Sequence, residues 1–282
     1  MVPSEFLKIA LPNKGSLAES ASQIMKEAGY RQRTDQRDLS FIDPDNGVEF
    51  YYLRPRDIAT YVGSGELTIG ITGRDLLQDS GASAVEITGL DFGKSTFRFA
   101  ARSGNSSLKG ARIATAYPTL VRNYIAKTSI DASIVRLDGA VESAIKLGVA
   151  DVIADVVSTG STLKQAGLEI FGETILSSEA ILIERSGAVR NSKVETLVRR
   201  INGVVIARQY VLVDYDVPRS ALDAACALTP GLESPTISPL QKADWLAVRA
   251  MVRRNEVHLV MDQLWDVGAR GILVTDIHSC RL

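Results

Sequence analysis

The stretch ADVIADVVSTGSTLKQAGL at residues 150–168 decides the fold class. Its first half is an apolar run of strand length, and a turn of small and hydroxyl-bearing residues then leads into a short amphipathic helix. The same succession of strand, polar turn and helix recurs from Leu7 through roughly the first three quarters of the chain. Alternating strands and helices predict βαβ units with largely parallel sheets, in which ligands bind beyond the carboxyl ends of the strands.

Composition excludes several other classes of protein. The 282 residues suggest about two domains, and 45% hydrophobic with 23% charged residues excludes wholesale disorder. With 32 Lys+Arg against 33 Asp+Glu, the formal charge of -1 argues against a broad basic surface for nucleic acid. Apolar stretches are strand-length, far short of the ~20 residues that cross a bilayer. We therefore expect neither nucleic acid nor membrane as a partner.

Cysteine and histidine usage narrows the chemistry further. The opening residues MVPSEFLKIALPNKG lack a secretory pattern, so we expect a cytoplasmic protein in which Cys226 and Cys280 are reduced thiols. His258 and His278 are the only histidines, and neither has a metal-ligand spacing. Structural zinc and a Ser-His-Asp triad are therefore disfavoured.

Two turn-rich or extended segments, Gly89–Gly110 and the chain from Phe171, predict two crossings between two α/β lobes, and hence a cleft for a small molecule. The last quarter changes pattern. From Tyr210 the elements read β-α-β-β-α-β, with a helix that starts at Pro218, which is the ferredoxin-like order. The helices expected before it span Pro55–Tyr61, Pro118–Lys127, Ala140–Leu147 and Ser161–Ala166.

The most informative candidate site is the loop from Asp155 to Thr162. Small residues let a ligand approach the backbone closely, and hydroxyls with free N–H groups at a helix start suit a phosphate monoester. Asp155, at the strand end, could hold ribose hydroxyls or an oxygen bound to Mg²⁺. An ordinary Ser/Thr-capped strand-turn-helix explains the same pattern.

Four further strand ends carry candidate residues, each with an ordinary alternative. Lys14 and Gly15 could meet a phosphate or form a plain capped turn, because the P-loop spacing is absent. Arg54 could bind phosphate through its guanidinium or lie on a solvated face. Gly73 lies in a Gly-rich turn that also suits a tight strand-helix junction. Glu142 follows a strand at a helix start, where a carboxylate also favours the helix dipole.

In order along the chain, LPNKGSL, LRPRDI, GELTIGITGRDLL, RIATAYPTLVRNY, LDGAVE and ADVIADVVSTGSTL resemble the ATP phosphoribosyltransferase family. The stretches LVDYDVPRSAL, TPGLESPTISPL and GARGILVTDI resemble the C-terminal regulatory domain of its long form, and the similarity to actinobacterial members is close. The resemblance covers essentially the whole chain, and the combination of motifs is far more specific than any one of them.

The resemblance implies a fold and a domain plan. The fold is α/β, with a two-lobed, periplasmic-binding-protein-like catalytic unit plus a C-terminal ferredoxin-like (βαββαβ) regulatory domain. Residues 1–94 with 180–209 would form catalytic lobe I, residues 95–179 catalytic lobe II, and residues 210–282 the histidine-binding domain. A homo-oligomer, dimer or hexamer, is also implied.

The resemblance also implies the first step of histidine biosynthesis: ATP and 5-phosphoribosyl-1-pyrophosphate give N1-(5-phosphoribosyl)-ATP and pyrophosphate, with Mg²⁺ held through the substrate phosphates. Histidine would inhibit by feedback. Asp155 and Glu142 would be catalytic. Binding roles would fall to three groups: for phosphoribosyl pyrophosphate Asp155, Ser158, Thr159, Gly160, Ser161 and Thr162; for ATP and pyrophosphate Lys14, Gly15, Arg54 and Gly73; for histidine Asp216, Leu232, Ser234, Thr236 and Gly271. The alternative is a two-lobed small-molecule binding protein without catalysis.

Overall fold

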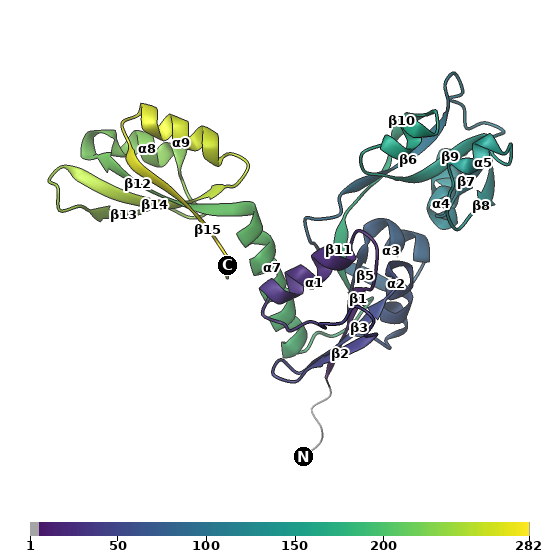
Figure 1. The fold of residues 1–282 in the computed structure, drawn as a ribbon, viewed down its shortest axis with the longest axis horizontal. Helices are drawn as coiled ribbons and strands as arrows, with labels where there is room; N and C mark the ends of the chain where they lie inside the picture. The colour runs from purple at the N-terminus through teal and green to yellow at the C-terminus, as the bar shows by residue number, and fades with distance from the viewer. Residues whose placement is uncertain (1–5, 282) are drawn as a thin grey trace, which may run out of the picture. The chain divides into compact units, whose positions relative to one another are not determined.

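The computed structural model describes residues 6–281, and the chain divides into two compact units. One unit comprises the chain up to Lys26 together with Tyr30–Val194, and the other Glu27–Gly29 with the chain from Glu195 onward. The former contains two sheets, here the first and second sheets, and the latter contains the third sheet (Figure 1).

The first sheet has six strands in the order β2-β3-β1-β4-β11-β5. Parallel pairing joins β3, β1 and β4, whereas β2, β11 and β5 pair antiparallel to their neighbours. Strands β1 and β4 are almost wholly buried, as their uninterrupted apolar sequences require. The elements are β1 (Leu7–Pro12), α1 (Ala18–Glu27), β2 (Ser40–Asp43), β3 (Val48–Leu53), α2 (Pro55–Ser64), β4 (Ile69–Gly73), α3 (Arg74–Ser80), β5 (Ala84–Gly89) and β11 (Ala180–Arg185).

The second sheet has five strands in the order β10-β6-β9-β7-β8, and the chain enters it after β5 and leaves it before β11. Alternate residues of β6 point to opposite faces, so that Phe97 and Phe99 pack with helix α4 while Ala100 packs with α5 and α6. The elements are β6 (Ser95–Arg102), β7 (Arg112–Thr115), α4 (Pro118–Thr128), β8 (Ser133–Arg136), α5 (Ser143–Lys146), β9 (Val152–Val157), α6 (Ser161–Gln165) and β10 (Leu168–Ser178).

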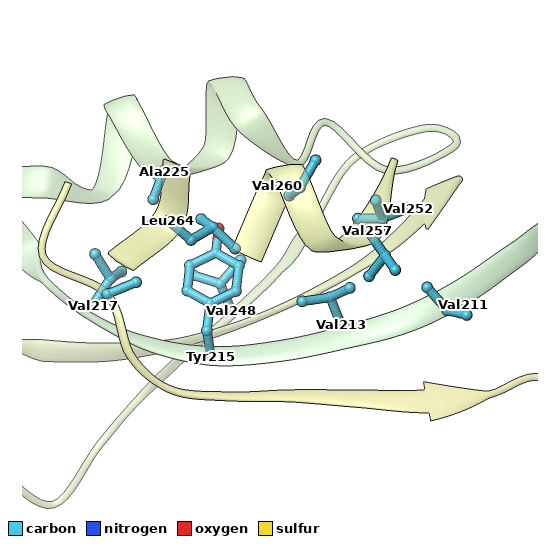
Figure 2. Close-up of a cluster of buried hydrophobic side chains, with 11 residues drawn as sticks. Val211, Val213, Tyr215, Val217, Ala225, Val248, Val252, Val257, Val260 and Leu264 are labelled. Carbon is cyan, nitrogen blue, oxygen red and sulfur yellow. The ribbon is translucent and has the colours of Figure 1, made fainter. Parts of the chain in front are cut away.

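The third sheet has the order β13-β14-β12-β15 with antiparallel neighbours throughout, which confirms the ferredoxin-like arrangement. Side chains of β12 and β14 pack under α8 and α9, and Tyr215 stands toward the helices in Figure 2. Burying each large apolar side chain there contributes roughly 1.5–3 kcal/mol. The elements are α7 (Ser192–Gln209), β12 (Tyr210–Pro218), the 3₁₀ turn Arg219–Ala221, α8 (Leu222–Leu228), β13 (Thr236–Pro239), β14 (Trp245–Arg253), α9 (Val257–Asp266) and β15 (Arg270–Asp276).

Three expectations about local structure were wrong. The first and second sheets are mixed, because the strands next to each crossing run against their neighbours. Pro218 ends strand β12, paired with Trp245, and helix α8 begins only at Leu222. Helix α5 is four residues long because Ala140, placed in the expected helix, has a left-handed φ of 47°.

Candidate active site

The carboxyl ends of β1, β3 and β4 share one edge of the first sheet, because these strands are parallel and adjacent. Lys14 and Gly15 follow β1 and are exposed, and Gly15 has a φ of 83° that glycine adopts without strain. Arg54 follows β3 in extended conformation, directly before Pro55 at the first position of α2. Gly73 ends β4 and precedes α3.

A polar cavity of about 630 Å³ opens beside Lys14 and Gly15. Two further cationic side chains, Lys26 and Arg33, line it, and the Arg33 guanidinium lies 3.7 Å from the centre of the Tyr52 ring. The complete lining is Asn13, Lys14, Gly15, Ala18, Glu19, Ser22, Gln23, Lys26, Gln32, Arg33, Thr34 and Gln36. Three cations around one cavity suit an anionic ligand. Sequence reasoning missed Lys26 and Arg33, which lie in a helix and a loop without a strand-end signal.

Gly73 and Arg54 differ in how tightly the structure specifies them. A Cβ at Gly73 would collide with the carboxylate of Asp75, so a larger residue at this strand-helix junction would force the Asp75 side chain to shift away from Ser178. Arg54 is exposed and lines neither this cavity nor the one beside Ser158 described below. The binding role of Arg54 therefore stays a prediction from the sequence.

The loop from Asp155 to Thr162 connects β9 to α6 in the second sheet. Gly160 has a φ of 72° and precedes the first residue of α6. The hydroxyls of Thr159 and Ser161 lie 3.0 Å apart, and Ser158, Thr159, Ser161 and Thr162 are all exposed. A turn of this shape presents hydroxyls and the free N–H groups at the beginning of α6 to a ligand, which suits phosphate oxygens.

Asp155 lies in an acidic and largely dehydrated environment. Burial raises the pKa of its carboxyl group, and the carboxylates of Glu142 and Asp75 raise the pKa further. The Val156 N–H, which donates to Asp155 Oδ1 at 2.7 Å, and the Arg56 guanidinium both lower that pKa. Besides Glu142, the charged side chains that affect Asp155 are therefore Asp75 of α3 and Arg56 of α2, two residues that the sequence did not single out as site residues.

Tyr117 joins the same group from the end of β7. Burial raises the pKa of its phenol, and the carboxylates of Asp75 and Asp155 raise the pKa further. Asp75 is itself buried and accepts a hydrogen bond from Ser178 Oγ at 2.6 Å. Three acids (Asp155, Glu142 and Asp75), the Tyr117 phenol and the Arg56 cation thus influence one another electrostatically. The signal that could have indicated Tyr117 is its place between a strand and Pro118, the first residue of α4.

A second cavity, of about 450 Å³, lies beside Ser158. Its two cations are already paired: Arg74 binds Glu86 and Glu179, and Lys94 binds Asp91. The complete lining is Arg74, Lys94, Ser95, Thr96, Val157, Ser158, Ser177, Ser178 and Glu179.

In the third sheet, Asp216, Thr236 and Gly271 lie on or beside the face that α8 and α9 leave uncovered. Asp216 alternates with the buried Tyr215 and Val217 of β12, so its side chain projects from the uncovered face. A Cβ at Gly271 would lie 3.5 Å from Asp216 Oδ2. Thr236 pairs with Arg249, which forms an ion pair with Asp214 at 2.6 Å.

Leu232 and Ser234 lie in the loop before β13, and both are exposed. Gly231 turns this loop with a φ of 69°, and its Cα approaches the Ser234 carbonyl so closely that a Cβ would lie 3.1 Å from the oxygen. Leu232 is therefore not part of the hydrophobic core.

Residues 6–281 contain no group of three or more His, Cys, Asp or Glu side chains arranged to hold a metal ion. Over the same range, no helix is both long and apolar enough to cross a bilayer.

Comparison with known proteins identifies the family. The family model described as ATP phosphoribosyltransferase matches residues 54–203, and the one described as HisG, C-terminal domain, matches residues 207–279. ATP phosphoribosyltransferase from Pseudarthrobacter chlorophenolicus is 57% identical over 283 residues, which cover 98% of this chain and 100% of that protein. The enzyme of the same name from Salinispora tropica is 58% identical over 280 residues, with the same coverage.

A chain of the ATP phosphoribosyl transferase (HisG:HisZ) complex from Thermotoga maritima has a similar structure, with a TM-score of 0.63 and 26% identity. The similarity covers 71% of this chain and 98% of that one. Together with the fold and the strand-end loops, these comparisons define a phosphoribosyl-transferring enzyme on a two-lobed α/β scaffold. The chain belongs to the ATP phosphoribosyltransferase family, in the long form with a C-terminal domain. The non-catalytic alternative is thereby set aside.

Proposed function

We propose that this chain joins ATP and 5-phosphoribosyl-1-pyrophosphate into N1-(5-phosphoribosyl)-ATP and pyrophosphate, as the first step of histidine biosynthesis. The observation that carries the proposal is the β9–α6 loop, where Asp155 ends a strand and Ser158–Thr162 open a helix. The hydroxyls and N–H groups of Ser158, Thr159, Gly160, Ser161 and Thr162 would bind the 5-phosphate, and Asp155 would face the ribose.

For this reaction the protein must stabilise developing charge, and it need not form a covalent intermediate with the substrate. N1 of adenine attacks C1 of the ribose while pyrophosphate leaves, so positive charge develops on the sugar ring. Asp155 and Glu142, both half-buried, would stabilise that charge because few water molecules compete there. The protein's other contribution is alignment of the two substrates.

The cavity beside Lys14 and Gly15 would take the phosphates of ATP or the leaving pyrophosphate. Its cations Lys14, Lys26 and Arg33 supply positive charge, and the main chain at Gly15 lets a phosphate approach closely. Arg54 and Gly73, at neighbouring strand ends, would border the same substrate.

Magnesium fits this site as an ion that arrives with the pyrophosphate. Mg²⁺ takes oxygen ligands, commonly one or two carboxylates plus substrate phosphates. Burial, and to a lesser extent the carboxylates of Glu142 and Asp75, raise the pKa of Asp155, and a bound cation would favour its ionised form. The carboxylates of Asp155 and Glu142 would hold the ion, and when bound it would offset the charge of the leaving pyrophosphate.

The third sheet would sense histidine. Asp216 offers a carboxylate for the amine or imidazolium of the ligand, while Thr236, Ser234 and the main chain at Gly271 offer polar contacts and Leu232 an apolar one. The family resemblance supports assembly into dimers and hexamers, with histidine favouring the larger form. The cytoplasmic location stays a prediction.

The decisive experiment measures pyrophosphate release from ATP and phosphoribosyl pyrophosphate with Mg²⁺, with product mass confirmed by mass spectrometry. Absence of product at saturating substrate would overturn the catalytic assignment. The regulatory assignment is tested by Thr236→Ala, which we expect to weaken histidine inhibition while basal turnover persists. Serine at the same position keeps the hydroxyl and should keep the inhibition.

A further inference from the structure

Helix α4 has no cap of its own. The residue before it is Tyr117, whose side chain makes no capping hydrogen bond, and Pro118 at the first position has no N–H. The first N–H groups that need an acceptor therefore belong to Thr119 and Leu120. The Tyr117 side chain does not accept from them, so the acceptor must come from another part of the chain.

Asp79, on a helix that packs on the first sheet, caps α4, which packs on the second sheet. Its Oδ1 accepts the N–H groups of Thr119 at 2.8 Å and Leu120 at 3.1 Å, although Asp79 lies on α3 of the first sheet. Its Oδ2 accepts from the Arg56 guanidinium at 3.1 Å. The Asp79 side chain is only 7% exposed, so these charge-assisted bonds form where water competes little.

The same contacts orient Arg56 toward the proposed active site. Its guanidinium carbon lies 4.9 Å from the centre of the Tyr117 ring, and Tyr117 in turn is coupled to Asp75 and Asp155. One carboxylate thus holds both the amino end of α4 and the Arg56 guanidinium, a cation that lowers the pKa of Asp155. Asp75, one turn earlier on α3, holds Ser178 in the same way.

We propose that Asp79 is a positioning residue of this enzyme: by capping α4 across the two sheets and pairing with Arg56, it sets the alignment of the groups around Asp155. This inference rests on the proposed function. The groups proposed to bind each substrate lie on one sheet or the other, so loss of Asp79 leaves them intact and disturbs mainly their mutual alignment. Misalignment by a fraction of an ångström lowers the rate of the chemical step more than it lowers binding.

The test compares Asp79→Ala, Asp79→Asn and the control Asp57→Asn, which changes an exposed acid on α2. In Asp79→Ala we expect amide exchange in the first turn of α4 to accelerate and kcat to fall, each by about tenfold, with both KM values little changed. The asparagine oxygen can still cap α4, so Asp79→Asn should keep amide protection yet lose part of kcat with its Arg56 pairing. The control should behave as the wild type.

A folded Asp79→Ala variant with wild-type exchange and wild-type kcat would overturn the proposal. So would a loss of kcat with unchanged exchange. If Asp79→Ala does not fold, Asp79→Asn decides. Wild-type kcat in Asp79→Asn would refute the Arg56 contribution, whereas a kcat that falls in Asp79→Asn but not in the control Asp57→Asn would support it. Amide exchange is measured without substrates, so it remains decisive for the cap even if the wild type releases no pyrophosphate.

Discussion

Gly271 of β15 packs directly against Asp216 of β12, so that a Cβ at Gly271 would come within 3.5 Å of Asp216 Oδ2. With a φ of 61°, Gly271 also has a left-handed backbone that β-branched residues strongly disfavour. In the proposed histidine site, a side chain at position 271 would therefore occupy space beside the Asp216 carboxylate.

Gly271→Val should abolish or strongly weaken histidine inhibition while turnover without histidine persists. The branched side chain fills the approach to Asp216 and strains the strand locally. Inhibition curves and calorimetric titration with histidine measure the effect. Thr275→Ala, an exposed change on the same strand, serves as the control; equal sensitivity of Gly271→Val and wild type would remove Gly271 from the site.

Asp155→Asn should lower kcat by roughly a hundredfold or more, because the amide cannot offset positive charge on the ribose. The same change should raise the melting temperature at neutral pH. The folded state raises the pKa of Asp155, so the ionised carboxylate costs stability above that pKa, and the cost vanishes as pH falls below the unfolded value of about 4.

The melting temperatures of wild type and Asp155→Asn should therefore converge toward acid pH, as calorimetry from about pH 7 to pH 4 would show. The Val156 N–H bond survives in the variant, since asparagine keeps an acceptor oxygen. A variant with unchanged turnover would exclude Asp155 from the reaction.

Gly160→Ala should raise the KM for phosphoribosyl pyrophosphate. The nearest atoms to the new methyl group, in Ile170 and Val157, lie 3.7 Å away, so space is available. The cost comes from the left-handed φ of 72°, about 1–2 kcal/mol for a residue with a Cβ. Steady-state kinetics with each substrate varied in turn would check that the KM for ATP changes much less.

The Arg112–Asp151 ion pair predicts an acid dependence of stability. Hydrogen bonds from the Arg112 side chain and main chain lower the pKa of Asp151 to about 2. The pair's contribution is complete above the unfolded pKa of about 4 and is lost as pH falls through about 2. Because both groups are exposed, the effect is small.

Asp151→Asn should therefore flatten the decline in urea stability between those two pH values. Asp138→Asn removes a looser exposed pair with Arg136, at 3.6 Å, and should leave the slope unchanged. An identical slope in wild type and Asp151→Asn would show that the pair contributes nothing.

The sequence predicted the two α/β lobes and the ferredoxin-like domain because buried strands and amphipathic helices leave strong local patterns. It did not predict helix α7, whose interior holds Gly203, a residue that disfavours helix by about 1 kcal/mol. A Cβ at Gly203 would collide with the Cys280 carbonyl, so a tertiary contact selects this glycine. No local pattern could reveal that contact.

The residues of the candidate site also fall into two kinds: those that a local sequence pattern indicates and those that only long-range packing brings together. Asp155 lies in β9 near its carboxyl end and Glu142 directly precedes α5, positions that the alternation of strands and helices predicts to lie at the ligand-binding edge. Asp79 meets Thr119 and Leu120 only through packing between α3 and α4, and the bonded residues lie 40 and 41 positions apart in the sequence. Such long-range pairs carry no spacing that a single sequence displays.

Strand β11 has a consequence for the order in which the chain acquires structure. It lies between β4 and β5 and is the partner of β5 in the first sheet, yet it follows the whole of the second sheet in sequence. A nascent chain that has left the ribosome only as far as Glu179 can complete the second sheet while β5 still lacks its neighbour. During synthesis the second sheet can therefore form before the first sheet is complete, and β4 and β5 lack the strand between them until Arg185 has emerged from the ribosome.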